Sequence, residues 1–149
     1  MDVKSTFLNG VIEEEVYIEQ LEGFETHDQK THVCKLKKAL YGLNQAPRAW
    51  YGRIDSYLQK MGFVKSDADP NLYYLRVGDE ALILVLYVDD LFLTGSSRLI
   101  KDCKENLVTV FNMKDLGRMH YFLGLEVWQQ KGEIFLGRER YTTEILKRF

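Results

Sequence analysis

The sequence has 149 residues, 46% of them hydrophobic, and a formal net charge of −2 at pH 7. This length suits one domain with one core, the apolar share excludes a disordered tail, and the longest apolar run, 81–88, is too short to span a bilayer. The slight negative charge is weak evidence against nucleic acid, but the excess of Lys and Arg in residues 35–76 could follow a phosphate backbone or be an ordinary solvated surface.

The first third of the chain gives weak signals, with extended segments expected at 16–18 and 33–36. The clearest helix is predicted to begin at Pro47, because the first helical position tolerates the missing N–H of proline. Gly62 is suited to the C-terminal cap of this helix. Apolar residues at helical spacing form one face of the helix: Trp50, Ile54, Tyr57, Leu58 and Met61.

Two apolar runs, 72–77 and 81–88, flank a Gly78-Asp79 turn and predict a β-hairpin. Another short strand is expected at 91–94. A second helix is predicted from about Arg98 to Phe111, with a cap from a serine just before it. The two candidate caps are Ser96 and Ser97, and the apolar face comprises Leu99, Ile100, Cys103, Leu107 and Phe111.

The last part of the chain predicts a hairpin and a helix. The hairpin joins 119–128 to 133–136 around Lys131-Gly132, and the helix begins near Thr142 or Thr143. Helices mixed with antiparallel strands in this way predict an α+β fold, with a small antiparallel sheet and helices on one of its faces.

Two adjacent aspartates, Asp89 and Asp90, lie between the two most apolar strands. One interpretation is a solvated turn, because Asp favours turns. The other is a metal site, because clustered carboxylates favour hard cations such as Mg²⁺, and a pair of such ions supports in-line displacement at phosphorus. That chemistry needs a carboxylate from elsewhere in the fold, for which Asp2 is the candidate.

Three segments together resemble the motifs of copia-type reverse transcriptases. They are Met1–Gly10, Leu40–Trp50 and Tyr87–Asp90, the last being the Tyr-x-Asp-Asp box of reverse transcriptases generally. The box alone is a weak signal, whereas the second segment is specific and the order and spacing of all three agree. Further matches continue as far as Glu126, so the resemblance covers essentially the whole chain.

The resemblance implies that three aspartates are catalytic and hold two Mg²⁺ ions, with Mn²⁺ as a substitute: Asp2, Asp89 and Asp90. Nucleotide-binding residues would be Ser5 and Thr6 through backbone N–H groups, Phe7 against the sugar, Gln45 and Lys114. Primer and template would contact Tyr87, Arg48, Phe122, Leu123 and Gly124. Each of Phe7, Gln45 and Lys114 has an ordinary structural alternative, as a core, loop or solvated residue, and we assign Trp50 to the core.

The implied architecture is a polymerase palm with partial fingers and the start of the thumb. Residues 1–10 would be a remnant of the first motif, 11–46 the junction of fingers and palm, 47–117 the palm with its catalytic hairpin, and 118–149 a primer-grip-like hairpin and thumb start. The implied function is RNA-directed DNA polymerisation from dNTPs on an RNA or DNA template-primer during retrotransposition.

The implied partners are the other segments of a Pol polyprotein, namely fingers, thumb, RNase H and integrase, with no membrane partner. The expected location is a cytoplasmic virus-like particle or the nucleus. The alternative function is an inactive transposon relic that at most binds nucleic acid. Because only Met1 precedes Asp2, we expect the N-terminus to fray and the chain alone to be inactive. A nucleotide cyclase is disfavoured, because its glycine-rich hairpin motif is absent from the sequence.

Overall fold

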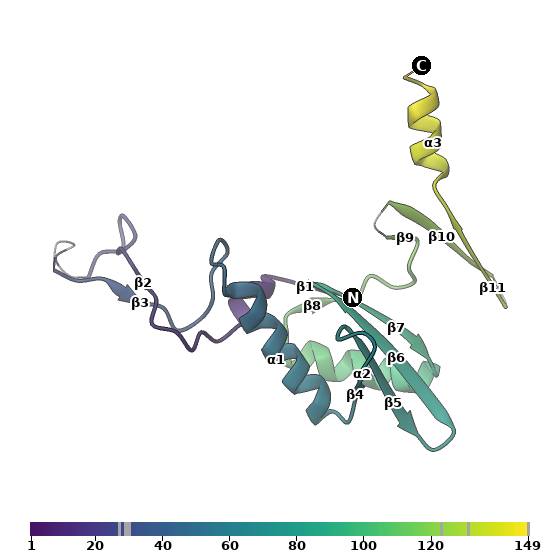
Figure 1. The fold of residues 1–149 in the computed structure, drawn as a ribbon, viewed down its shortest axis with the longest axis horizontal. Helices are drawn as coiled ribbons and strands as arrows, with labels where there is room; N and C mark the ends of the chain where they lie inside the picture. The colour runs from purple at the N-terminus through teal and green to yellow at the C-terminus, as the bar shows by residue number, and fades with distance from the viewer. Residues whose placement is uncertain (27, 29–30, 123, 131, 149) are drawn as a thin grey trace. The chain divides into compact units, whose positions relative to one another are not determined.

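Antiparallel pairing builds a six-stranded sheet in the order β4-β5-β6-β7-β1-β8 (Figure 1). The computed structural model describes residues 1–26, 28, 31–122, 124–130 and 132–148. The strands are β1 (Asp2–Val3), β4 (Val64–Lys65), β5 (Leu72–Val77), β6 (Glu80–Tyr87), β7 (Asp90–Gly95) and β8 (Met113–Lys114). The sheet belongs to the first of two compact units, Met1–Asp115, and the second unit is Leu116–Phe149.

Two helices bury the same face of this sheet. They are α1 (Ala46–Lys60) and α2 (Ser97–Val110), so both predicted helices are confirmed to within a residue or two at each end. Their buried residues join the core side of the central strand in one cluster: Trp50, Ile54 and Leu58 from α1, Leu99, Cys103 and Leu107 from α2, and Leu82, Leu84 and Leu86 from β6. The predicted mixture of helices with an antiparallel sheet is therefore confirmed. Within the described residues, no helix has both the length and the apolar character needed to cross a membrane.

The central strand β6 presents different residues on its two faces, as side chains alternate along a strand. Leu82, Leu84 and Leu86 are buried, whereas Ile83 and Tyr87 between and beyond them are exposed. The sheet thus has one face in the core and one face open.

The predicted position of a serine at the N-cap of α2 is confirmed, but the side-chain capping bond is absent. Ser96 occupies the N-cap position, but its hydroxyl makes no capping bond and donates instead to Glu80 Oε1 at 2.6 Å. Arg98 forms an ion pair with the same carboxylate. The Ser96 hydroxyl therefore binds the carboxylate of Glu80, sixteen residues earlier, instead of a backbone N–H of the helix.

The segment before α1 contains three short elements. A 3₁₀ turn, η1 (Thr6–Asn9), follows β1, and β2 (Tyr17–Ile18) pairs with β3 (Cys34–Lys35). The two extended segments expected in this region are confirmed, although each forms only two residues of paired strand. The 3₁₀ turn was not predicted.

The second unit is built from a three-stranded sheet and a helix. Its strands are β9 (Tyr121–Phe122), β10 (Leu125–Gln130) and β11 (Glu133–Gly137), and its helix is α3 (Glu139–Leu146). The expected single strand over 119–128 is wrong, because the chain turns at Gly124, whose φ is 81°. Lys131, in the expected turn of the late hairpin, lies outside the described residues.

Helix α3 begins at Glu139, earlier than the predicted Thr142 or Thr143. Its first N–H groups have an acceptor that local sequence does not reveal. Glu126 Oε2 accepts from Glu139 N at 3.1 Å and from Arg140 N at 3.4 Å, and Glu126 Oε1 lies 3.2 Å from Arg140 Nε. A buried carboxylate of β10 therefore caps the helix from thirteen residues upstream.

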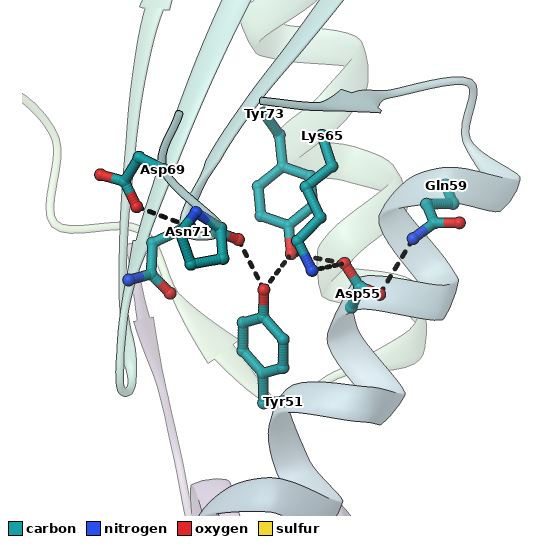
Figure 2. A network of polar contacts seen from close by, with 8 residues as sticks. Tyr51, Asp55, Gln59, Lys65, Asp69, Asn71 and Tyr73 are labelled. Atoms are coloured by element: carbon teal, nitrogen blue, oxygen red, sulfur yellow. Dashed lines mark hydrogen bonds and ion pairs between the residues drawn. The ribbon is translucent and has the colours of Figure 1, made fainter. Parts of the chain in front are cut away.

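A polar network joins α1 to β4 and β5 in the first unit (Figure 2). The carboxylate of Asp55 accepts hydrogen bonds from the Tyr73 hydroxyl at 2.6 Å and Gln59 Nε2 at 2.9 Å, and lies 3.2 Å from Lys65 Nζ. Tyr51 extends the network by donating to the carbonyl of Pro70 at 2.5 Å. These hydrogen bonds and this ion pair thus connect one side of α1 to β4 and β5, at the edge of the sheet.

This network predicts an acid-sensitive contribution to stability. Burial raises the pKa of Asp55, but hydrogen bonds from Tyr73, Lys65 and Gln59 outweigh it and hold the pKa below the usual value. A depressed pKa in the folded state means that the contribution is complete above the unfolded pKa of about 3.9 and is lost as pH falls through the folded value. Urea unfolding should therefore show that Asp55→Asn is destabilising at neutral pH and that the difference from wild type shrinks below about pH 4.

The matched control for this experiment is Asp67→Asn, which changes an exposed aspartate in the loop before β5. It should leave the stability difference close to zero at every pH. A constant penalty for Asp55→Asn across the whole pH range would show that lost side-chain packing, rather than the carboxylate charge, explains the destabilisation.

Candidate active site

Four predicted site residues form a row across neighbouring strands of the sheet. The strand register pairs Tyr87 with Asp90, Asp90 with Asp2, and Asp2 with Lys114. Directly opposite residues of an antiparallel pair project from the same face. Because Met1 and Val3 on either side of Asp2 are buried in the core, the row lies on the open face.

The hairpin between β6 and β7 places Asp89 at its tip, in a turn with Val88. Asp89 is exposed, whereas Asp90 and Asp2 are half-buried. Since β1 lies directly beside β7, the structure brings Asp2 next to the Asp89-Asp90 pair. The hypothesis from sequence required this proximity.

The N-terminus does not fray, contrary to our expectation. Met1 is 8% exposed, and its amino group donates to Leu91 O at 2.7 Å. In return Leu91 N donates to Met1 O at 2.8 Å, and Val3 N donates to Asp89 O at 2.9 Å. Pairing with β7 and burial in the core thus hold β1 in place, although the strand has only two residues.

The carboxylate of Asp90 is affected by its surroundings and by the two neighbouring aspartates. Burial raises the pKa of Asp90, and the negative charges of Asp89 and Asp2 raise it further. Like charges that raise a pKa in this way make the ionised state less favourable, and a bound cation would relieve this repulsion.

The donor chemistry of this site fits a hard divalent cation, because carboxylate oxygen is the ligand that Mg²⁺ prefers. Among the described residues, however, no three His, Cys, Asp or Glu side chains are gathered into a group that could hold a metal ion. The features that suit a cation are therefore the donor type, the shared open face of Asp2 and Asp90, and the negative charges that raise the pKa of Asp90.

The residues after β1 turn the chain sharply. Ser5 has a left-handed conformation, with φ at 52°, and the 3₁₀ turn follows it. Thr6 is buried, and its hydroxyl donates to Val3 O at 2.8 Å. The Thr6 side chain is therefore structural, and only the backbone of Ser5 and Thr6 remains a candidate for ligand binding.

Phe7 is half-buried and lies beside the β6–β7 hairpin. Its ring is 4.9 Å from that of Tyr41, centroid to centroid, with the planes tilted by 55°. It also lines a pocket of about 270 Å³ together with residues of α1 and the hairpin. Trp50, Tyr87 and Val88 also line this pocket.

Gln45 and Arg48 line a second, larger hollow of about 610 Å³ along α1. Gln45 is the N-cap residue of the helix, and its side chain makes no capping hydrogen bond. The backbone carbonyl of Gln45 accepts from Ala49 N at 3.0 Å. The side chain is therefore not used to begin the helix, which leaves its predicted nucleotide role open.

Phe122 and Gly124 lie in the second unit, at the end of β9 and in the turn to β10. Leu123, the third residue predicted to contact primer at this position, lies outside the described residues. The primer and template roles of these residues stay predictions.

One contact of the β6–β7 hairpin was not predicted from the sequence. Trp50 is buried, as predicted for a core residue, but its indole Nε1 also donates to Val88 O at 2.7 Å. A buried tryptophan needs a partner for its N–H, which is the only signal in the sequence that could have pointed to this bond.

Comparisons with known proteins agree with the resemblance. A family model described as reverse transcriptase (RNA-dependent DNA polymerase) matches residues 1–149. The chain is 42% identical to a retrovirus-related Pol polyprotein from transposon TNT 1-94 of Nicotiana tabacum, over 100% of the chain and 12% of the polyprotein. It is 41% identical to the Pol polyprotein from transposon RE1 of Arabidopsis thaliana, over 99% of the chain and 10% of the polyprotein.

A third relative is the putative transposon Ty5-1 protein of Saccharomyces cerevisiae, 36% identical over 95% of the chain and 46% of that protein. The chain thus spans about a tenth of the length of the two plant polyproteins and about half of the yeast protein. No solved structure matches the chain.

Proposed function

Since the chain belongs to the reverse transcriptase (RNA-dependent DNA polymerase) family, as a copia-type Pol polyprotein segment, we propose that it contains the centre where a primer is extended. The proposed reaction is attack of a primer 3′-hydroxyl on the α-phosphate of a dNTP, with release of pyrophosphate. The observation that carries this proposal is the row in which Asp2 stands directly between Asp90 and Lys114 on the open face of the sheet.

The proposed catalytic and metal-binding residues are Asp2, Asp89 and Asp90. When bound, two Mg²⁺ or Mn²⁺ ions would supply charge neutralisation at the reacting phosphate. The carboxylates of Asp2 and Asp90 leave the sheet at opposite residues of neighbouring strands, which suits ligands that must converge. Asp89 at the exposed tip completes the set.

The proposed nucleotide site adjoins these carboxylates. A left-handed residue followed by a right-handed turn directs successive N–H groups to one side, and Ser5 with Thr6 has this backbone geometry. Lys114 stands opposite Asp2, where its ammonium group suits a triphosphate. Phe7 would contact the sugar, and Gln45 would line the nucleotide pocket.

The proposed contacts to primer and template involve residues of both units. Tyr87 precedes the turn and pairs with Asp90, which suits contact with the primer end. Arg48 is exposed on α1 and would bind phosphate. Phe122, Leu123 and Gly124 would belong to a primer-grip-like hairpin.

In domain terms, the proposed palm comprises the six-stranded sheet with α1 and α2. Residues 11–46 would contribute to the junction with the fingers, and residues 118–149 would form a primer-grip-like hairpin followed by the start of the thumb. The remaining fingers and thumb, RNase H and integrase of a Pol polyprotein would be the partners of this segment.

The experiment that tests the proposal is primer extension by a chimeric polymerase. Residues 1–149 replace the matching segment of the tobacco polyprotein, so that the neighbouring segments are supplied by a relative. We expect extension of a labelled primer on RNA and DNA templates with Mg²⁺. Duplex binding without any extension, under conditions where the tobacco protein extends primers, would favour the inactive relic.

A further inference from the structure

The turn that carries Asp89 is held from two sides. The carbonyl of Val88 accepts from the indole Nε1 of Trp50 at 2.7 Å, and the carbonyl of Asp89 accepts from Val3 N at 2.9 Å. The first donor belongs to α1 and the second to β1. Each carbonyl of the two-residue turn is thus fixed by an element outside the hairpin.

The conformation of Val88 makes such support necessary. Its φ is 54°, in the left-handed region. A β-branched residue with positive φ is a genuine outlier, and such a residue persists only when the surroundings hold it. An unsupported turn of this kind would relax toward other backbone conformations, and the direction of the Asp89 carboxylate would change with it.

Trp50 is well suited to hold this turn. It is 2% exposed, and its ring packs edge-on against Phe111, with centroids 5.5 Å apart and planes at 87°. The residues one and two turns further along α1, Ile54 and Leu58, are fully buried in the same core. The packing of the Trp50 ring in the core therefore fixes the direction of its indole N–H, which points toward the turn.

We infer that Trp50 is a positioning residue for catalysis: it fixes the strained turn through the Val88 carbonyl and thereby sets the direction of Asp89 and Asp90. Trp50 itself contacts no reacting group in this scheme. The effect on catalysis rests on the proposed polymerase function. The mechanical part, support of the turn by the indole N–H, does not depend on it.

The first test uses the 149-residue chain and nuclear magnetic resonance. Trp50→Phe removes the donor and keeps an aromatic ring in the core. The backbone amide signals of Asp89 and Asp90 should shift and broaden in this variant. The control, Ile54→Val, removes one buried methylene from the same face of α1 and should leave these two signals in place.

The wild-type spectrum supplies a second readout, because the sequence contains only two tryptophans. The indole N–H of Trp50, a buried residue, should exchange slowly with solvent. The indole N–H of Trp128, an exposed residue, should exchange fast. Unchanged Asp89 and Asp90 amides in Trp50→Phe, or a fast-exchanging Trp50 indole, would overturn the inference whatever the activity of the polymerase.

The second test uses the chimeric polymerase. Loss of one hydrogen bond that positions a catalytic group should lower kcat about tenfold in Trp50→Phe, with little change in KM for dNTP. Ile54→Val should keep kcat within about twofold of wild type, since Ile→Val costs only modest stability. A Trp50→Phe variant with wild-type kcat would overturn the role of Trp50, whereas an inactive wild-type chimera would count against the proposed function alone.

A double-mutant cycle separates support of the turn from general packing. Asn tolerates the left-handed conformation, so Val88→Asn should reduce the need for the indole bond. In that background, Trp50→Phe should lower kcat by at most about threefold, which makes the two effects non-additive. An identical tenfold loss in both backgrounds would show that Trp50 acts through the core and would overturn the inference.

Discussion

Asp89→Asn is expected to abolish primer extension by the chimeric polymerase, with a loss of about a thousandfold or more in kcat, because each proposed ion is worth several kcal/mol of charge stabilisation. The substitution keeps the size of the side chain and removes its charge. The fold should survive, since the structural bond at this position uses the backbone carbonyl, which accepts from Val3 N at 2.9 Å.

The matched control is Asp79→Asn. Asp79 lies in the turn at the other end of β6 and, like Asp89, is exposed at the tip of a hairpin. This variant should extend primers at close to the wild-type rate. Equal activity of the two variants would mean that Asp89 is an ordinary solvated turn residue, the alternative that the sequence left open.

Phe7→Val is expected to let the chimeric polymerase incorporate ribonucleotides, improving the ratio of rNTP to dNTP use by on the order of a hundredfold, because a steric clash is an effective way to reject a competing ligand. The ring is held in place on one side by Tyr41, with centroids 4.9 Å apart. A shorter side chain would leave room for a ribose 2′-hydroxyl beside the proposed nucleotide site. Single-nucleotide insertion assays with matched dNTP and rNTP measure the ratio.

Leu8→Val is the control for this experiment. Leu8 is the next residue of the same 3₁₀ turn and is 38% exposed. It should leave the selection between sugars unchanged. If Phe7→Val loses stability but selects dNTPs as strictly as wild type, Phe7 is a core residue and not a sugar gate.

The helices and hairpins marked by helical spacing of apolar residues, by Pro or by Gly could be predicted from the sequence. Helix α1 begins within a residue of Pro47 and buries the predicted apolar face, and the β5–β6 hairpin turns at Gly78 as expected. Strands β1 and β8 were not predicted as elements, because each has two residues and forms only through pairing with residues far away in the sequence, such as Asp2 with Asp90 and with Lys114. The early start of α3 likewise depends on the distant carboxylate of Glu126.

The candidate site shows the same division. Resemblance to a family identified the three aspartates and Lys114 from short motifs, and the strand register then placed Asp2 between Asp90 and Lys114. Resemblance could not reveal that the Thr6 hydroxyl donates to Val3 O, nor that the Trp50 indole donates to Val88 O in the β6–β7 hairpin. These hydrogen bonds depend on which backbone carbonyl lies near the side chain in the folded protein. The spacing of residues along the sequence does not give that distance.

The alternation of core residues and open-face residues along the central strands also disfavours a shifted strand register. Leu86 and Leu91 face the core, while their neighbours Tyr87 and Asp90 face solvent. A slip of β7 by one residue along β6 would reverse these orientations, burying a carboxylate and exposing a leucine, at a cost of several kcal/mol. The burial of hydrophobic side chains that selects the native strand register therefore also selects the register in which Asp90 projects from the open face, beside Asp2.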